Sequence, residues 1–209
     1  TVTLPSSVDF SNVIVNGGEN VFEKKSDNGT NATYELSVYS GPVETETETA
    51  YGTIPETYAS KDQYPFAVFR NGVFVGAYPA WGGADKAANS ALTNAREEGS
   101  VILLRRDFTY SSDYYNNLSQ TKTNTLVDLG GFTFTVVAQP MFNAQKKSAQ
   151  DTAITVKNGN IVVSGSEAVI KLSSWNANGA YAGGNKFDFT FDNVNIKLNA
   201  AAGTNRIIS

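Results

Sequence analysis

The side chains that could do chemistry in this chain are carboxylates, lysines, arginines and tyrosines, because the sequence contains no histidine and no cysteine. This excludes Ser-His-Asp triads, HExxH zinc sites, cysteine nucleophiles and disulfides. Asp188 and Asp192 alternate with Phe189 and Phe191, which places both acids on one face of an extended strand. We expect them about 6 to 7 Å apart, near the separation found in inverting glycosidases. The alternative is that both are solvated surface charges, and we expect no other catalytic residue.

Aromatic side chains that could stack on sugar rings form a second set of candidates. Tyr114, Tyr115 and Trp175 fall in expected loops and are the candidates for carbohydrate binding. Trp81 is a further possibility, whereas Tyr110 falls among apolar strand positions and is expected in the core. The alternative for the loop aromatics is that they fold over the protein surface without binding anything.

The glycine pair Gly130-Gly131 lies between two strand-like runs, in TLVDLGGFTFTVV. Glycines can cradle a phosphate, form a turn or mark a repeated bend. No GxxxxGK[ST] pattern follows the pair, and the next residues are typical of a strand and not of a helix. A nucleotide loop is therefore disfavoured.

The composition is that of an ordinary globular protein of 209 residues, with 41% hydrophobic residues and a net charge of -4. Scattered basic residues argue against nucleic-acid binding, and no apolar run is long enough to span a membrane. We expect no metal and no cofactor. The abundance of Asn, Ser, Thr, Gly and Tyr without Cys favours a secreted or cell-surface location. Three glycosylation sequons occur, at Asn28, Asn31 and Asn117. A chain rich in Asn and Thr contains such sequons by chance, and that is the interpretation we favour.

The first part of the chain predicts a β-rich segment over 1–60 that precedes a larger domain over 61–209. Turn sequences such as DNGTN separate alternating runs in this segment, which forms a small domain or an extra strand layer. The stretch VETETETA predicts a solvated edge or linker, since its three glutamates would share one strand face. They are Glu44, Glu46 and Glu48.

The second part begins with two predicted local structures, a hairpin and a helix. Asn71-Gly72 between apolar runs predicts a tight hairpin. Alanines at helical spacing before Gly99 predict a helix over 84–97 that caps the strands following it. All later runs are typical of strands.

Four segments of eight residues then superpose without gaps, starting at Leu103, Val127, Val156 and Phe191. Their fifth positions are all residue types that accept positive φ, which predicts a recurring left-handed bend. At the third position, the last two segments both carry asparagine, which predicts a stacked amide ladder. At the second position, the last three segments carry charges of alternating sign. Repeated strand-bend-strand units predict parallel stacking in a β-solenoid. The predicted bend column is Asp107, Gly131, Asn160 and Asn195.

The pieces GSVILLRRDFTYSS, TLVDLGGFTFT and ITVKNGNI within 64–200 resemble the right-handed, pectate-lyase-like parallel β-helix units of large bacterial surface proteins. Gly130 and Phe132 depart from the asparagine and histidine usual in that family. The resemblance implies a mainly β fold, a right-handed parallel β-helix with a short N-terminal capping helix. In its enzymes, outer-face carboxylates work with a Lys or Arg base, and the nearest basic residues to Asp188 and Asp192 would be Lys157, Lys171 and Lys186.

These observations predict a non-enzymatic secreted or cell-surface module that acts as an adhesin, a stalk or a carbohydrate-binding surface. Its expected partner is a polysaccharide or cell-surface glycan, with self-association through an open C-terminal end as a further possibility. One alternative is a fragment of a polysaccharide lyase or glycoside hydrolase. The other is a subunit of a self-assembling filament or surface layer.

Overall fold

A computed structural model describes residues 1–8, 14–15, 20–38, 46–82, 89–111, 124–145, 151–165, 168–173, 186–199 and 206–208. The chain forms two compact units, Thr1–Val43 and Glu44–Ser209. The boundary thus lies well before residue 60, where we expected it. The reason is that the chain around Ala59 is hydrogen bonded to Arg105 of the second unit.

The first unit is an antiparallel sheet whose strands follow the order β1-β4-β3-β2. The long pair β3–β4 turns at Asn28, whose side-chain oxygen accepts bonds from the backbone N–H groups of Thr30 and Asn31 at 2.9 and 2.8 Å. Gly29 in this turn has φ +83°. Strands joined by tight turns were predicted here, and the prediction is confirmed. The strands are β1 (Val2–Pro5), β2 (Ile14–Val15), β3 (Asn20–Asp27) and β4 (Asn31–Val38).

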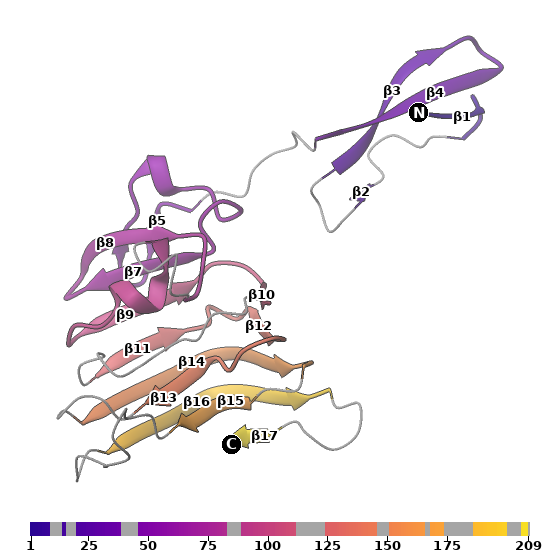
Figure 1. Cartoon of the computed structure of the whole chain (residues 1–209). Coiled ribbons are helices and arrows are strands. Elements are labelled where there is room, and N and C mark those ends of the chain that lie inside the picture. Colours follow the sequence, from indigo (N-terminus) through magenta and orange to yellow (C-terminus); the bar gives the residue numbers. More distant parts are fainter. Residues whose placement is uncertain are drawn as a thin grey trace. The chain divides into compact units, whose positions relative to one another are not determined.

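The second unit is built on an eight-stranded sheet (Figure 1). Its path is β10-β12-β14-β11-β9-β7-β8, and β16 pairs with β14 beside this path. The members are β7 (Phe66–Arg70), β8 (Val73–Tyr78), β9 (Ser100–Leu104), β10 (Phe108–Tyr110), β11 (Thr125–Asp128), β12 (Thr133–Val136), β14 (Thr152–Val163) and β16 (Phe187–Leu198).

Smaller elements complete the second unit. A three-stranded parallel sheet has the order β13-β15-β17, from β13 (Phe142–Gln145), β15 (Ala168–Ser173) and β17 (Arg206–Ile208). A two-stranded hairpin joins β5 (Glu48–Thr49) to β6 (Gly52–Thr53). It is followed by the 3-10 helix η2 (Glu56–Tyr58).

The predicted right-handed parallel β-helix is wrong. The protein is mainly β, but its sheets mix antiparallel and parallel strands, and the large sheet curls into a half-barrel. Strand β7 pairs antiparallel with both β8 and β9, whereas β9, β11, β14 and β16 run parallel. The stacked segments do run parallel, but the hairpin strand β7 joins their sheet antiparallel through β9. The sequence pattern shows which positions face inward and does not show the direction of such a distant neighbouring strand.

The Asn71-Gly72 hairpin is confirmed, with Arg70 opposite Val73 and positive φ at both turn residues, 50° and 79°. The helix predicted over 84–97 is not found in that extent. Residues 83–88 lie outside the described part, and the helix α1 covers only Ala91–Asn94. Its buried Ala91 and Leu92 lie in the main core, so this element packs as part of the core and is not a long cap.

The predicted register is confirmed throughout for the last two segments, and for the segment from Val127 only at its first two positions; for the first segment it is wrong. Val127, Val156 and Phe191 share one column, while Leu103 pairs with Asp128 and thus lies one residue out of line. After the corner, Thr133 and not Gly131 lies opposite Asn160. The glycine pair therefore makes a wider corner that takes up two extra residues.

The predicted bend column is also wrong, except at Gly131, where φ is +85°. The bend lies two positions earlier in the later strands, at Asn158 and Asn193, with φ of 55° and 53°. Asp107, Asn160 and Asn195 are not among the positive-φ residues. The amide ladder is confirmed, since Asn193 donates to Asn158 at 3.3 Å, and Asn195 donates to Asn160 at the same distance.

Candidate functional site

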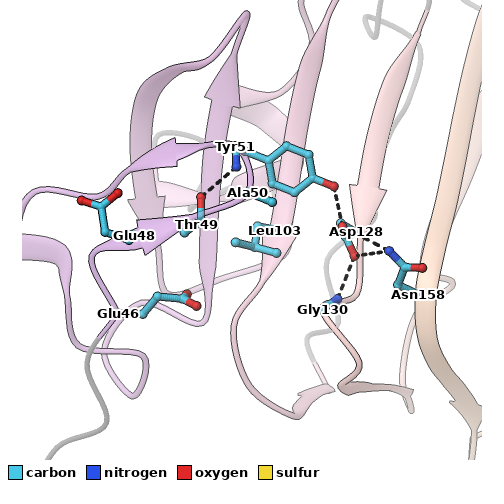
Figure 2. Close-up of a pocket in the computed structure, with 9 residues that line it drawn as sticks. All are labelled: Glu46, Glu48, Thr49, Ala50, Tyr51, Leu103, Asp128, Gly130 and Asn158. Carbon is cyan, nitrogen blue, oxygen red and sulfur yellow. Dashed lines mark hydrogen bonds between the residues drawn. The ribbon is translucent and has the colours of Figure 1, made fainter.

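An open pocket of about 460 Å³ lies in the second unit, between the β5–β6 hairpin and the corner that follows β11. Figure 2 shows Tyr51 reaching from the hairpin toward Asp128, with Asn158 beyond it. The wall on the hairpin side carries the two glutamates of the pocket. The lining residues are Glu46, Glu48, Thr49, Ala50, Tyr51, Leu103, Asp128, Gly130 and Asn158.

Asp128 is the centre of the polar network in this pocket. Its carboxylate accepts bonds from the Tyr51 hydroxyl, from the Gly130 N–H at 3.0 Å and from the Asn158 amide at 3.3 Å. The Lys157 ammonium lies 3.7 Å from the same group. Because four donors surround this buried carboxylate, it is fixed in orientation.

The corner sequence explains why these groups meet. Gly130 turns with φ +59°, which allows its N–H to reach back to the Asp128 side chain. Asn158 on β14 bends with φ +55° at the neighbouring corner, and its amide lies beside Asp128. Parallel pairing of β11 with β14 sets Asp128 opposite Lys157. The site is thus built where two bends stack.

Two groups in this network have shifted pKa values. Burial, together with the hydrogen bond to Asp128, raises the pKa of Tyr51 above its ordinary value. The interaction with Tyr51 and the charge of Asp128 raise the pKa of Lys157. Both shifts move the pKa away from neutrality, so at neutral pH Tyr51 stays a neutral phenol and Lys157 stays a cation. Neither group is therefore suited to act as a general base.

The hairpin wall is held by Arg105, whose side chain is wholly buried. Its guanidinium donates to Glu46 Oε2 at 3.1 Å. Four further bonds, between 2.6 and 3.0 Å, run to backbone carbonyls of the 46–64 segment, which are those of Glu46, Tyr58, Ala59 and Tyr64. Glu46 therefore anchors the segment, and its predicted place on a solvated edge is wrong.

The tip of the hairpin is fixed by short local bonds. The Thr49 hydroxyl donates to the Gly52 carbonyl at 2.7 Å, and the Tyr51 N–H donates to the Thr49 hydroxyl at 3.1 Å. Thr53 donates to both carboxylate oxygens of Glu48 at 3.2 Å, and Glu48 stays exposed. The Tyr51 ring packs 6.2 Å from Phe69 of β7. These contacts hold Tyr51 and Glu48 in place before any ligand arrives.

The predicted catalytic pair lies outside this pocket. Asp188 and Asp192 are both exposed on β16 and share a face, as expected. The expected spacing is wrong, because four residues of strand at roughly 3.3 Å each separate them by about 13 Å. That exceeds the separation used by either class of glycosidase.

The lysines named with that pair do not gather around it. Lys157 lies opposite Asp192. Lys171 belongs to β15 in the other sheet, where it lies opposite Asn143. Lys186 donates its backbone N–H to Asp151 at 2.8 Å. The structure therefore does not assemble the lyase-like group of acids and bases that the resemblance implied.

The predicted aromatic candidates have different fates. Tyr114, Tyr115 and Trp175 lie outside the described residues, as does the sequon residue Asn117. Trp81 is fully buried and donates its indole N–H to the Met141 carbonyl at 2.8 Å, so it is a core residue. Tyr110 lies in the core, as predicted. The sequon residues Asn28 and Asn31 are exposed.

Tyr51 is the site residue that sequence reasoning missed. It lies 77 positions before its hydrogen-bond partner Asp128, in a segment that we expected to belong with the first unit. No spacing rule joins two residues so far apart. Asp128 and Lys157 were in the predicted stacked register, although nothing there indicated a pocket.

Within the described ranges, the side chains of Asp and Glu form no group of three or more that could hold a metal ion. No helix in the same ranges is long and apolar enough to cross a membrane.

Comparisons of the chain with protein-family models, with curated proteins and with solved structures find no match.

Proposed function

We propose that this chain is a non-enzymatic, secreted or cell-surface module that binds carbohydrate in the pocket of Figure 2. The observation that carries the proposal is the prearranged polar wall of an open pocket beside an aromatic side chain. Carbohydrate sites combine fixed hydrogen-bonding groups with apolar or aromatic surface. Here Glu48 and Asn158 supply polar groups, while Tyr51 and Ala50 supply the apolar surface.

Binding is favoured over catalysis by the state of the acids. The Asp128 carboxylate is occupied by protein donors, and Glu46 is paired with buried Arg105. Groups held in this way keep a fixed geometry, which suits recognition of a ligand. Glu48 is the most available acceptor in the pocket, since it is exposed and, among the described residues, only the Thr53 hydroxyl donates to it. Sugar hydroxyls are donors suited to such a carboxylate.

The test is a glycan array followed by titration calorimetry on the glycans that bind. Glu48→Gln keeps the shape of the side chain and removes its charge, and we expect binding to weaken about tenfold because charge-assisted bonds are about twice as strong as neutral ones. The matched control is Glu56→Gln, which changes an exposed glutamate on η2 outside the pocket and should leave binding unchanged. Equal binding by both variants, or an array without any bound glycan, would overturn the proposal.

A further inference from the structure

Strand β16 has one strand edge with no described partner. Over twelve residues it pairs with β14, and no other described strand pairs with it. In the three-stranded sheet, β17 likewise has β15 as its one described neighbour. Unpaired backbone groups along such edges are templates for another strand.

This end of the unit also exposes apolar side chains. Leu198 on β16 is 40% exposed, and Ile207 and Ile208 on β17 are 42% and 56% exposed. Phe187, Phe189 and other inward residues of β16 pack on the core but stay only half-buried. A strand added beside β16 would cover part of the inward face of β16, which water meets in the free protein.

The side chains of β16 specify what such a strand should carry. Across the parallel strands, Asp128, Lys157 and Asp192 occupy successive positions of one column, so that charge alternates from strand to strand. The next member of this column should be basic, since it would lie opposite Asp192. Asn193 and Asn195 each donate to an asparagine of β14, and the same ladder continues if the new strand has an amide opposite each of them.

The bend in β16 specifies the shape of the added strand. Asn158 and Asn193 both have positive φ and are neighbours in adjacent parallel strands, which keeps the two bends aligned. An added parallel strand with Asn or Gly opposite Asn193 can adopt the same positive φ, so its bend aligns with that of β16. A strand without a bend at this position would place straight chain against the bend of β16 and lose hydrogen bonds there.

We propose that the free edge of β16 binds an extended segment of a partner polypeptide, parallel to β16, with Lys or Arg opposite Asp192 and amide side chains opposite Asn193 and Asn195. The chain itself contains one sequence of this kind, the β14 segment TAITVKNGNIVV, whose Lys157 already lies opposite Asp192 from the other side. A synthetic peptide of this sequence is therefore the probe.

The experiment measures binding of the labelled peptide to the whole protein by fluorescence anisotropy. A second peptide carries Glu in place of the lysine. Wild-type protein should bind the lysine peptide about tenfold more tightly, and Asp192→Lys should reverse that order, because opposite charges across strands attract and like charges repel. Asp188→Lys is the matched control, since Asp188 is exposed on the same face but lies opposite Ala153, and it should keep the wild-type order.

Hydrogen exchange locates the bound peptide. Protection should increase over 187–198, while exchange in β11 stays unchanged. Faster exchange in β11 would mean that the peptide displaces native β14, which would overturn edge binding. The absence of peptide binding, or an unchanged order with Asp192→Lys in protein that keeps its circular dichroism, would also overturn it. Concentration-dependent self-association in sedimentation, abolished by Asp192→Lys, would assign the edge to a second copy and contradict the proposal.

Discussion

Arg105 should be the polar side chain on which the second unit depends most. The change Arg105→Met keeps much of the aliphatic volume and removes the guanidinium, which makes one bond to the Glu46 carboxylate and four to backbone carbonyls. Glu46 is partly exposed, so the main cost falls on the four backbone carbonyls that lose their donor. A buried acceptor left without its donor costs about 1 to 3 kcal/mol, and several together amount to about 3 to 5 kcal/mol. We expect a loss in this range, together with release of the 46–64 segment that forms the pocket wall.

The assay is urea denaturation monitored by circular dichroism, with hydrogen exchange over 46–64 as the local readout. Arg106→Met is the matched control, since Arg106 pairs with Asp62 at 2.6 Å on the surface and both side chains are largely exposed. Exposed ion pairs contribute about 1 kcal/mol or less, so this variant should be close to wild type. Equal effects of the two substitutions, or unchanged exchange over 46–64 in Arg105→Met, would refute the anchoring role.

Two further predictions concern a corner and a pKa. Gly131→Val should cost about 1 to 2 kcal/mol and Gly131→Asn much less, since φ is +85° and no atom crowds a new Cβ there; equal thermal shifts would contradict this. Bonds from the Ser6 hydroxyl and the Gly29 N–H lower the pKa of Asp27 from 3.8 to about 2. The unfolded chain binds more protons between these values, so the stability contributed by Asp27 is complete above about pH 4 and is lost as pH falls toward 2. An NMR titration should show this low pKa, and Ser6→Ala should raise it; an unchanged pKa in the variant would contradict the stated cause.

Local structure was largely predictable from the sequence. The Asn71-Gly72 turn follows from residues that accept positive φ, and the strands follow from alternating apolar positions. The column of Val127, Val156 and Phe191 was also predictable, because apolar residues recur at the same place in each segment. These features depend on short-range chemistry or on a repeated pattern.

Pairing direction and the pocket were not predictable in the same way. β7 pairs antiparallel with β9 after a long excursion of the chain, and its apolar residues would suit either direction. Arg105 was placed in a repeat column, yet its burial depends on carbonyls from a segment more than 40 residues away. Tyr51 likewise reaches Asp128 only through tertiary folding. Such long-range polar contacts leave no periodic trace in the sequence.

Carbohydrate binding at the pocket beside Tyr51 is the central claim, and an NMR titration tests it most directly. A glycan that binds on the array is added to isotope-labelled protein while the backbone amide signals are followed. We predict that the largest shifts occur at Tyr51 and Gly130, whose N–H groups bond within the pocket network. Shifts confined to residues outside the pocket, with Tyr51 and Gly130 unmoved at saturation, would contradict the account.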